Sequence, residues 1–210
     1  GEVFVSLGVS FVPNFVSLYD EGVGDEGLYS ELTPPKSSGE RWIGVAPFAK
    51  HKGKIYPLDR MEKVVSKLSE ESRVKIFLFG SGDREREILS LWRERYPGVI
   101  SLADKRYGFA VELSLMSRLD VMISMDSANM HLASLVEVPV VSVWGATHPY
   151  CGFLGWRQSD SGVVELPLDC RPCSVFGNKP CYRKDYACLE IAPETIVDRV
   201  KSLETLIKEK

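Results

Sequence analysis

The chain has 210 residues, of which 44% are hydrophobic and 26% are charged, and its formal net charge is −3. This length and composition fit one ordinary globular domain with a full core, or one domain with part of another. The acidic balance argues against a dedicated nucleic-acid binder, which carries a basic face, and no run reaches the roughly 18 apolar residues that span a bilayer.

The first 40 residues show no sustained helix or strand period, apart from a short strand suggested near Val3–Leu7. The sequence PPKSSGE at Pro34–Glu40 is typical of a linker. We therefore expect residues 1–40 to be a linker or the tail of an upstream domain, and residues 41–210 to form the folded domain. The start lacks Met and the layout of a signal peptide, so we expect a fragment of a cytoplasmic protein with reduced thiols.

From residue 41 onward, short apolar runs alternate with helical patterns. Five runs are bounded by turn residues and predict buried parallel strands. These runs are Trp42–Ala46, Val74–Phe79, Val99–Leu102, Val121–Met125 and Val140–Trp144. Strands joined by helices of this length favour right-handed crossovers. The predicted fold is therefore α/β, with a doubly wound Rossmann-like parallel sheet.

The helices between the strands are predicted from apolar stripes at helical spacing. The first follows Pro57 and has its stripe at Met61, Val64, Val65 and Leu68. The second places Ile88, Leu89, Leu91 and Trp92 on its inner face, and the third covers Phe109–Arg118. Residues 151–169 are expected to be a loop, and a last helix should run from Pro193 to Ile207, with Ile196, Val197, Val200, Leu203 and Ile207 on its apolar face.

A polar turn between two buried strands, Asp126 to His131, is the main candidate for chemistry. Ser127 is a good N-cap, so the amides of Ala128, Asn129 and Met130 should be free donors at a helix start. Free amides and the positive end of the helix dipole bind phosphate. Strand-end turns of an open α/β sheet face one crevice, so we expect a phosphate site here. A structural hydrogen bonder is the alternative interpretation of His131.

Two other strand-end loops carry weaker signals. Lys50, Lys52 and Lys54 lie close together after the first strand and could neutralise a leaving diphosphate, although exposed lysines are also common in solvated loops. After the second strand, Gly80-Ser81-Gly82 allows close backbone approach, and Asp83 could accept hydrogen bonds from a ribose. Gly and Asp are equally ordinary choices for capping the next helix.

Four cysteines gather in the segment 166–190. Cys170 and Cys173 have the spacing of a zinc knuckle, but Cys181 and Cys188 are separated by six residues, outside the usual pattern. A four-thiolate zinc site is therefore the weaker interpretation. Reduced or partly disulfide-linked loop cysteines are favoured.

The run DSANMHLASLVEVPVVSVWGATHP resembles the heptosyltransferases of glycosyltransferase family nine, in which Asp-Ser/Thr-x-x-x-His opens a helix and Gly-x-Thr-x-Pro follows the next strand. The Lys-x-aromatic-Pro sequence (Lys54, Tyr56, Pro57), the glycine turn with Asp83, and the tail sequence around Cys188 also resemble that family. The resemblance extends from about Trp42 to Ile207.

This resemblance implies the C-terminal half of a GT-B enzyme, with inverting transfer of heptose from ADP-heptose to a lipid-linked acceptor of the lipopolysaccharide core. No cofactor and no essential metal are implied. The implied donor-binding residues are Lys54 at the diphosphate, Asp83 near the ribose, Tyr107 against the base, Asp126 at the sugar, and Ser127, Ala128, Asn129 and His131 near the diphosphate. Partners would be the nucleotide sugar and the acceptor, without nucleic acid or a transmembrane segment. The location would be cytoplasmic, or peripheral at the inner membrane.

The general base of such an enzyme belongs to the N-terminal half, for which residues 1–40 leave no room. We therefore expect no catalytic residue in this chain, and donor binding without transfer. Two alternatives remain from the residues alone: a GT-B transferase that uses another nucleotide sugar, and a non-catalytic nucleotide-binding or interaction module.

Overall fold

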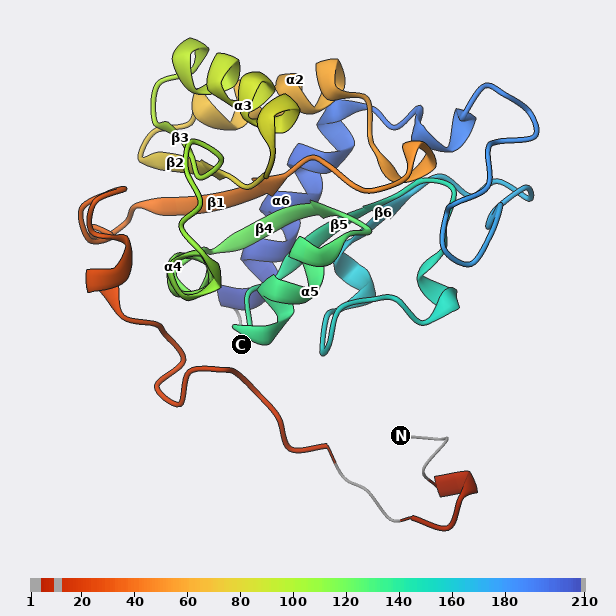
Figure 1. Cartoon of the computed structure of the whole chain (residues 1–210), viewed down its shortest axis with the longest axis horizontal. Coiled ribbons are helices and arrows are strands. Elements are labelled where there is room, and N and C mark those ends of the chain that lie inside the picture. The colour runs from red at the N-terminus through yellow and green to blue at the C-terminus, as the bar shows by residue number, and fades with distance from the viewer. Residues whose placement is uncertain (1–4, 10–12, 209–210) are drawn as a thin grey trace.

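A parallel sheet of six strands forms the centre of the computed structural model, which describes residues 5–9 and 13–208 (Figure 1). The strands are β1 (Arg41–Ala46), β2 (Val74–Leu78), β3 (Val99–Ser101), β4 (Val121–Met125), β5 (Val140–Trp144) and β6 (Val163–Glu165). Their order across the sheet is β3-β2-β1-β4-β5-β6. The direction of winding reverses between β1 and β4, which confirms the doubly wound fold and places the expected crevice at the carboxyl ends of these two strands.

Helices cover both faces of this sheet. On one face lie α2 (Leu58–Ser69), α3 (Asp83–Arg95) and α6 (Pro193–Lys208); on the other lie α4 (Phe109–Met116) and α5 (Ala128–Leu135) (Figure 1). Short 3-10 turns complete the structure: η1 (Glu26–Tyr29), η2 (Lys52–Lys54), η3 (Pro149–Cys151), η4 (Asp160–Gly162) and η5 (Ala187–Leu189). The sheet is therefore covered by helices on both faces, and each strand-end loop leads into one of these two helical layers.

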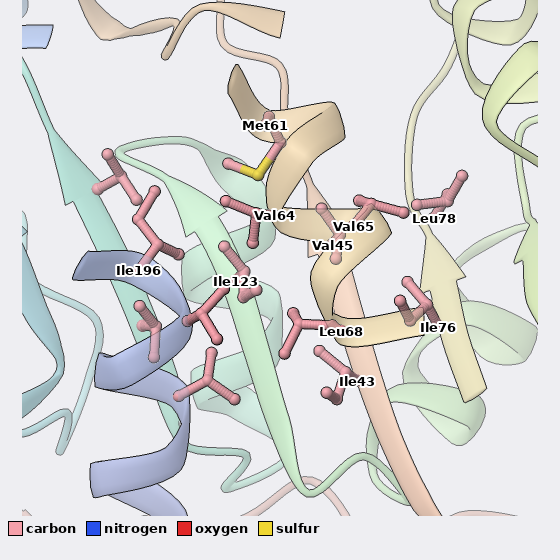
Figure 2. Close-up of a cluster of buried hydrophobic side chains, with 14 of the residues drawn as sticks. Ile43, Val45, Met61, Val64, Val65, Leu68, Ile76, Leu78, Ile123 and Ile196 are labelled. Atoms are coloured by element: carbon pink, nitrogen blue, oxygen red, sulfur yellow. The ribbon is translucent and has the colours of Figure 1, made fainter. Parts of the chain in front are cut away.

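The strands read as continuous apolar runs because both of their faces are buried. In β4 all five residues are buried; Ile123 belongs to the cluster beneath α2 and α6, whereas its neighbour Met122 belongs to the cluster beneath α4 and α5. Figure 2 shows the first cluster, in which Met61 and Ile196 from the two helices meet the strand side chains. Alternating side chains thus join one strand to two cores.

Part of the expected linker packs against the second layer. Tyr29 is 1% exposed and meets the Trp42 ring edge-on, with the centroids 6.1 Å apart. The Gly24 amide donates to Ser117 Oγ at 2.8 Å, and the Lys36 ammonium lies 2.7 Å from Asp120. The boundary between residues 40 and 41 stays a prediction, but residues 24–36 are anchored on the domain.

Three local predictions were wrong. The predicted loop 151–169 contains a sixth strand, β6, which pairs with β5; its three residues are too few for a visible period. Leu91 is 56% exposed rather than on the inner face of α3. The strand suggested near Val3–Leu7 lies partly outside the described residues, and Val5–Leu7 within them is helix and turn.

The segments that the structure describes contain no helix that is long and apolar enough to cross a membrane.

Candidate functional site

A cleft of about 640 Å³ opens at the switch point, over the carboxyl ends of β1, β2 and β4. Residues from all three predicted strand-end loops line it, together with Phe109, Glu112 and Phe153. Lys50 and Lys54 come from the first loop, Gly80 and Ser81 from the second, and Asp126, Ser127, Ala128, Asn129 and His131 from the third. The structure thus brings together most of the predicted donor-binding residues.

The lysine loop is fixed by its glycine. Gly53 O accepts a hydrogen bond from the Ala146 amide at 2.8 Å, and a Cβ at Gly53 would lie 2.7 Å from Ala146 Cβ. Only glycine therefore lets η2 lie this close to the end of β5. Lys54 is directed to the cleft by this packing, whereas the Lys52 ammonium lies over the Tyr186 ring, 5.1 Å from its centroid.

Lys54, Asp126 and Thr147 form a buried polar network that sequence reasoning did not predict. Lys54 Nζ lies 3.0 Å from Asp126 Oδ2, and the Thr147 hydroxyl donates to the same oxygen at 2.7 Å. The side chains of Lys54 and Asp126 are only 16% and 5% exposed. Among the described residues Asp126 Oδ1 has no hydrogen-bond partner, so one oxygen of this carboxylate is available at the cleft.

The start of α5 supplies amide donors beside this network. Ser127 occupies the N-cap with an extended backbone, but its side chain makes no cap hydrogen bond; Ser127 Oγ lies 3.3 Å from Ser124 Oγ instead. The Met130 amide donates to Ser127 O at 3.2 Å, so the prediction that it is free was wrong. Within the described ranges, the Ala128 and Asn129 amides have no partner. They and the helix dipole favour an anion here.

His131 lies one turn into α5, on the cleft side, and its side chain is exposed. In the part of the chain that the structure describes, its ring makes no hydrogen bond or ion pair. The structural interpretation of this histidine, as a hydrogen bonder within the fold, therefore has no support. The His131 ring is therefore open to contact a ligand in the cleft.

The glycine turn after β2 separates this cleft from a neighbouring cavity of about 790 Å³. Gly82 has φ +82° and ψ 163°, a conformation open to glycine alone, and it starts α3. Asp83 lines the second cavity, exposed and paired with Arg86. Glu85, which was not predicted, accepts a hydrogen bond from the Ser81 amide at 2.8 Å and fixes the turn.

Tyr107 is not among the residues that line either cavity. It is partly buried against the core cluster beneath α4 and α5, and the Lys105 ammonium lies 4.8 Å from its ring centroid. The aromatic side chain that lines both cavities is Phe109, two residues further on and 67% exposed. The contact of Tyr107 with a base stays a prediction that this arrangement does not support.

The cysteine segment packs over the end of β5. The Arg171 side chain, 2% exposed, donates to Gly145 O, Leu166 O and Thr147 O and pairs with Glu165 at 2.8 Å. A Cβ at Gly177 would lie 2.8 Å from the Lys54 side chain, so the segment also covers the aliphatic part of Lys54.

All the cysteines are free thiols. Burial raises the pKa of Cys188 to about 11; the nearby Arg171 guanidinium opposes this shift, and the other cysteines of the segment add smaller contributions to it. Within residues 5–9 and 13–208, no group of three or more potential ligands is arranged to hold a metal ion.

The topology and the cleft define a Rossmann-like α/β domain whose switch-point cleft is lined by lysines, carboxylates and the amide groups at the start of α5. The model of glycosyltransferase family 9 (heptosyltransferase) matches residues 25–181, and the chain belongs to this family.

Individual relatives agree with this assignment. The chain is 25% identical over 172 residues to "Lipooligosaccharide heptosyltransferase 2" of Campylobacter jejuni subsp. jejuni (serotype O:6), covering 80% of this chain and 53% of that protein. It thus spans about half the length of the curated relatives it matches.

Solved structures share the fold. A glycosyl transferase of family 9 from Veillonella parvula superposes with a TM-score of 0.72 at 17% identity, over 97% of this chain and 58% of that one. The E. coli ADP-heptose lps heptosyltransferase II gives a TM-score of 0.66 at 20% identity, over 89% of this chain and 53% of that one. At these identities the likeness concerns the fold, that of GT-B heptosyltransferases.

Proposed function

We propose that this chain is the donor-binding half of an inverting glycosyltransferase that transfers heptose from ADP-heptose to a lipid-linked acceptor of the lipopolysaccharide core. Family membership supports the reaction type. The names of the relatives, a lipooligosaccharide heptosyltransferase and an ADP-heptose lps heptosyltransferase, support the donor and the acceptor class. The observation in this chain that carries the proposal is the convergence of Lys54 and the free amides of Ala128 and Asn129 on one cleft.

The chemistry of the donor explains this arrangement. When the bond between the anomeric carbon and the diphosphate breaks, its electron pair goes to a β-phosphate oxygen, and negative charge builds on the leaving ADP. The Lys54 ammonium and the start of α5 are fixed donors aimed at that charge before the reaction begins. Donors that are already in place stabilise a developing charge without the cost of reorganising solvent.

Asp126 and His131 have roles on the donor side in this proposal. Asp126 Oδ2 holds Lys54 and Thr147, and Oδ1 is left to accept hydrogen bonds from sugar hydroxyls. His131 binds near the diphosphate. An inverting transfer also needs a base within hydrogen-bond reach of the acceptor hydroxyl, and we assign that base to a part of the whole protein outside these residues. The chain then binds donor but does not transfer sugar, and robust turnover by these residues alone would refute this assignment.

The same proposal covers location and cofactors. The protein acts in the cytoplasm, peripherally at the inner membrane where a lipid-linked acceptor resides, and it uses no essential metal. Its partners are the nucleotide sugar and the acceptor. The cleft of this chain, with its charged side chains, suits the first of them.

Calorimetric titration with ADP, together with thermal unfolding, tests the donor assignment. We expect ADP to bind, and Lys54→Ala to weaken binding by about one to two orders of magnitude, since a hydrogen bond to a charged group contributes about 1.5–3 kcal/mol. Lys52→Ala is the matched control, because Lys52 packs on Tyr186 rather than lining the cleft. Tighter binding of UDP or GDP than of ADP would indicate that the donor is a nucleotide sugar other than ADP-heptose. The absence of any nucleotide binding would favour an interaction module.

A further inference from the structure

Exposed apolar side chains gather on two consecutive turns of the cysteine segment. The turns are Ser174–Gly177 and Cys181–Lys184, each closed by a backbone hydrogen bond between its first and last residues, of 3.3 and 3.0 Å. In Figure 1 this blue part of the chain extends past the carboxyl ends of β5 and β6. The exposed apolar side chains are Val175, Phe176 and Tyr182, at 51%, 62% and 73% exposure. A single exposed hydrophobic residue is ordinary, but several in one short segment indicate a contact surface.

The base of these turns is fixed to the domain beside the cleft. Cys181 is 7% exposed, and Gly177 approaches the Lys54 side chain so closely that a Cβ would lie 2.8 Å from it. The Phe176 ring meets the ring of Phe153, which lines the cleft, with the centroids 5.7 Å apart. The exposed side chains are therefore held at the mouth of the cleft by a packed base.

The charge of this surface is opposite to that of the whole chain. Residues 174–184 contain no acidic residue, and Arg183 is paired with the following acid, Asp185, at 3.0 Å. Lys179 and Lys184 are exposed, and in the part of the chain that the structure describes their ammonium groups form no ion pair. Lys52 adds a third unpaired cation, because it packs on an aromatic ring of the segment. The surface is therefore cationic, although the chain has a net charge of −3.

We propose that this surface docks the protein on a lipid bilayer that contains anionic phospholipids. The lysines bind lipid phosphates, while Phe176 and Val175 enter the boundary between headgroups and acyl chains. Tyr182 suits the same boundary, since its ring is apolar and its hydroxyl stays hydrated. Mobile lysines around exposed rings match a fluid layer of phosphates over hydrocarbon, because neither side needs its partner at one fixed position.

Docking through these turns brings the cleft to the membrane surface. The inference deepens the proposed function and rests on one part of it, the location at a membrane with a lipid-linked acceptor. It adds the element that makes the contact and the lipid charge that this element selects. The acceptor then reaches the donor cleft without leaving the bilayer, because Phe176 and the cleft residue Phe153 are in contact.

Sedimentation with vesicles tests the cationic part of the surface. Vesicles of phosphatidylglycerol and phosphatidylethanolamine in equal parts should bind the chain, pure phosphatidylcholine vesicles should bind it weakly, and added salt should release it. We expect Lys179→Ala/Lys184→Ala to weaken binding about 25-fold, since each lysine near an anionic surface contributes about a factor of five. Lys63→Ala/Lys67→Ala, which removes two exposed lysines of α2, is the matched control.

The apolar part is tested by Phe176→Ser, which should weaken binding to the anionic vesicles about tenfold or more because the ring no longer leaves water. Leu91→Ser is the matched control, since Leu91 is 56% exposed on α3. Tryptophan at the same two positions measures depth directly. Brominated lipid should quench the added fluorescence of Phe176→Trp and leave that of Leu91→Trp unchanged.

The outcomes separate this inference from the donor assignment, because no vesicle experiment contains a nucleotide. If the vesicles bind as expected and ADP does not, the docking surface stands and the donor assignment fails. If ADP binds but the anionic vesicles do not, or the loop variants bind them as well as their controls do, only this inference is overturned. Self-association that Phe176→Ser abolishes, without vesicle binding, would assign the surface to a second copy and also overturn it. An unchanged thermal midpoint in each variant shows that a loss of binding arises from the missing contact.

Discussion

Removing Lys54 should destabilise the fold as well as weaken donor binding, and the two effects can be separated. In Lys54→Met the Asp126 carboxylate, 5% exposed, keeps only the Thr147 hydroxyl as a donor. Breaking a buried ion pair from one side costs about 3–5 kcal/mol. Since Lys54 is 16% exposed and water reaches the pair, we expect the lower end, about 3 kcal/mol. For a chain of this size that corresponds to roughly 6–12 °C in the unfolding midpoint.

The double variant Lys54→Met/Asp126→Asn removes both charges and should recover most of the lost stability, although its ADP binding should stay weakened. Chemical denaturation of the four proteins of this cycle measures the coupling. Lys67→Met is the matched control, because Lys67 and Glu194 pair on the surface at 45% and 59% exposure and such pairs contribute about 0–1 kcal/mol. The reasoning is wrong if the two single losses simply add, or if Lys54→Met is as mild as Lys67→Met.

Two further measurements concern acid stability and the thiols. Burial acts to raise the pKa of Glu40, but hydrogen bonds from Lys75, the Ser37 amide and the Trp42 indole outweigh it and lower the pKa from 4.5 to about 2. The stability that Glu40 contributes is therefore present above about pH 4.5 and lost as the pH falls toward 2. Glu40→Gln should flatten the plot of unfolding free energy against pH in this window. An unchanged slope in the variant would contradict the prediction. For the cysteines we expect protein purified without a His tag to carry no stoichiometric zinc or iron, and thiol titration after unfolding to find all five cysteines. A stoichiometric metal would return the four-thiolate site to consideration.

The central strands of the sheet were predictable because the local residue pattern of each strand indicates it. A strand such as β4 is buried on both faces, so its apolar run is uninterrupted and bounded by turn residues. β6 was not predicted, because its three residues, only one of them fully buried, are too few to show a strand period. Its place beside β5 is set by contacts distant in sequence, which include Gly162 approaching Val140 O so closely that a Cβ would lie 2.2 Å from it.

The candidate site was predictable as a set of loops but not as a network. Strand ends and a good N-cap residue pointed to Lys54, Asp126 and the start of α5. That Lys54 pairs with Asp126, and that Thr147 donates to the same oxygen, depends on how three strand ends approach one another. The position of Glu112 at the cleft was not predicted, because a single glutamate in a short helix has no sequence signal. Only the position of α4 in the fold places it there.

The network explains how a buried cation can serve an anionic ligand. Burying a lone Lys54 ammonium in this pocket would cost free energy, because a buried charge loses its water. The Asp126 carboxylate offsets that cost, and the Thr147 hydroxyl fixes the carboxylate, so that the segments after β1, β4 and β5 each contribute one member. The pair is nearly neutral while the cleft is empty, which limits its cost to the fold. Under the proposed function, a diphosphate meets an ammonium that Asp126 already holds in position. The pairing therefore serves stability in the empty state and preorganisation in the donor-bound state, and the double-mutant cycle separates these two roles.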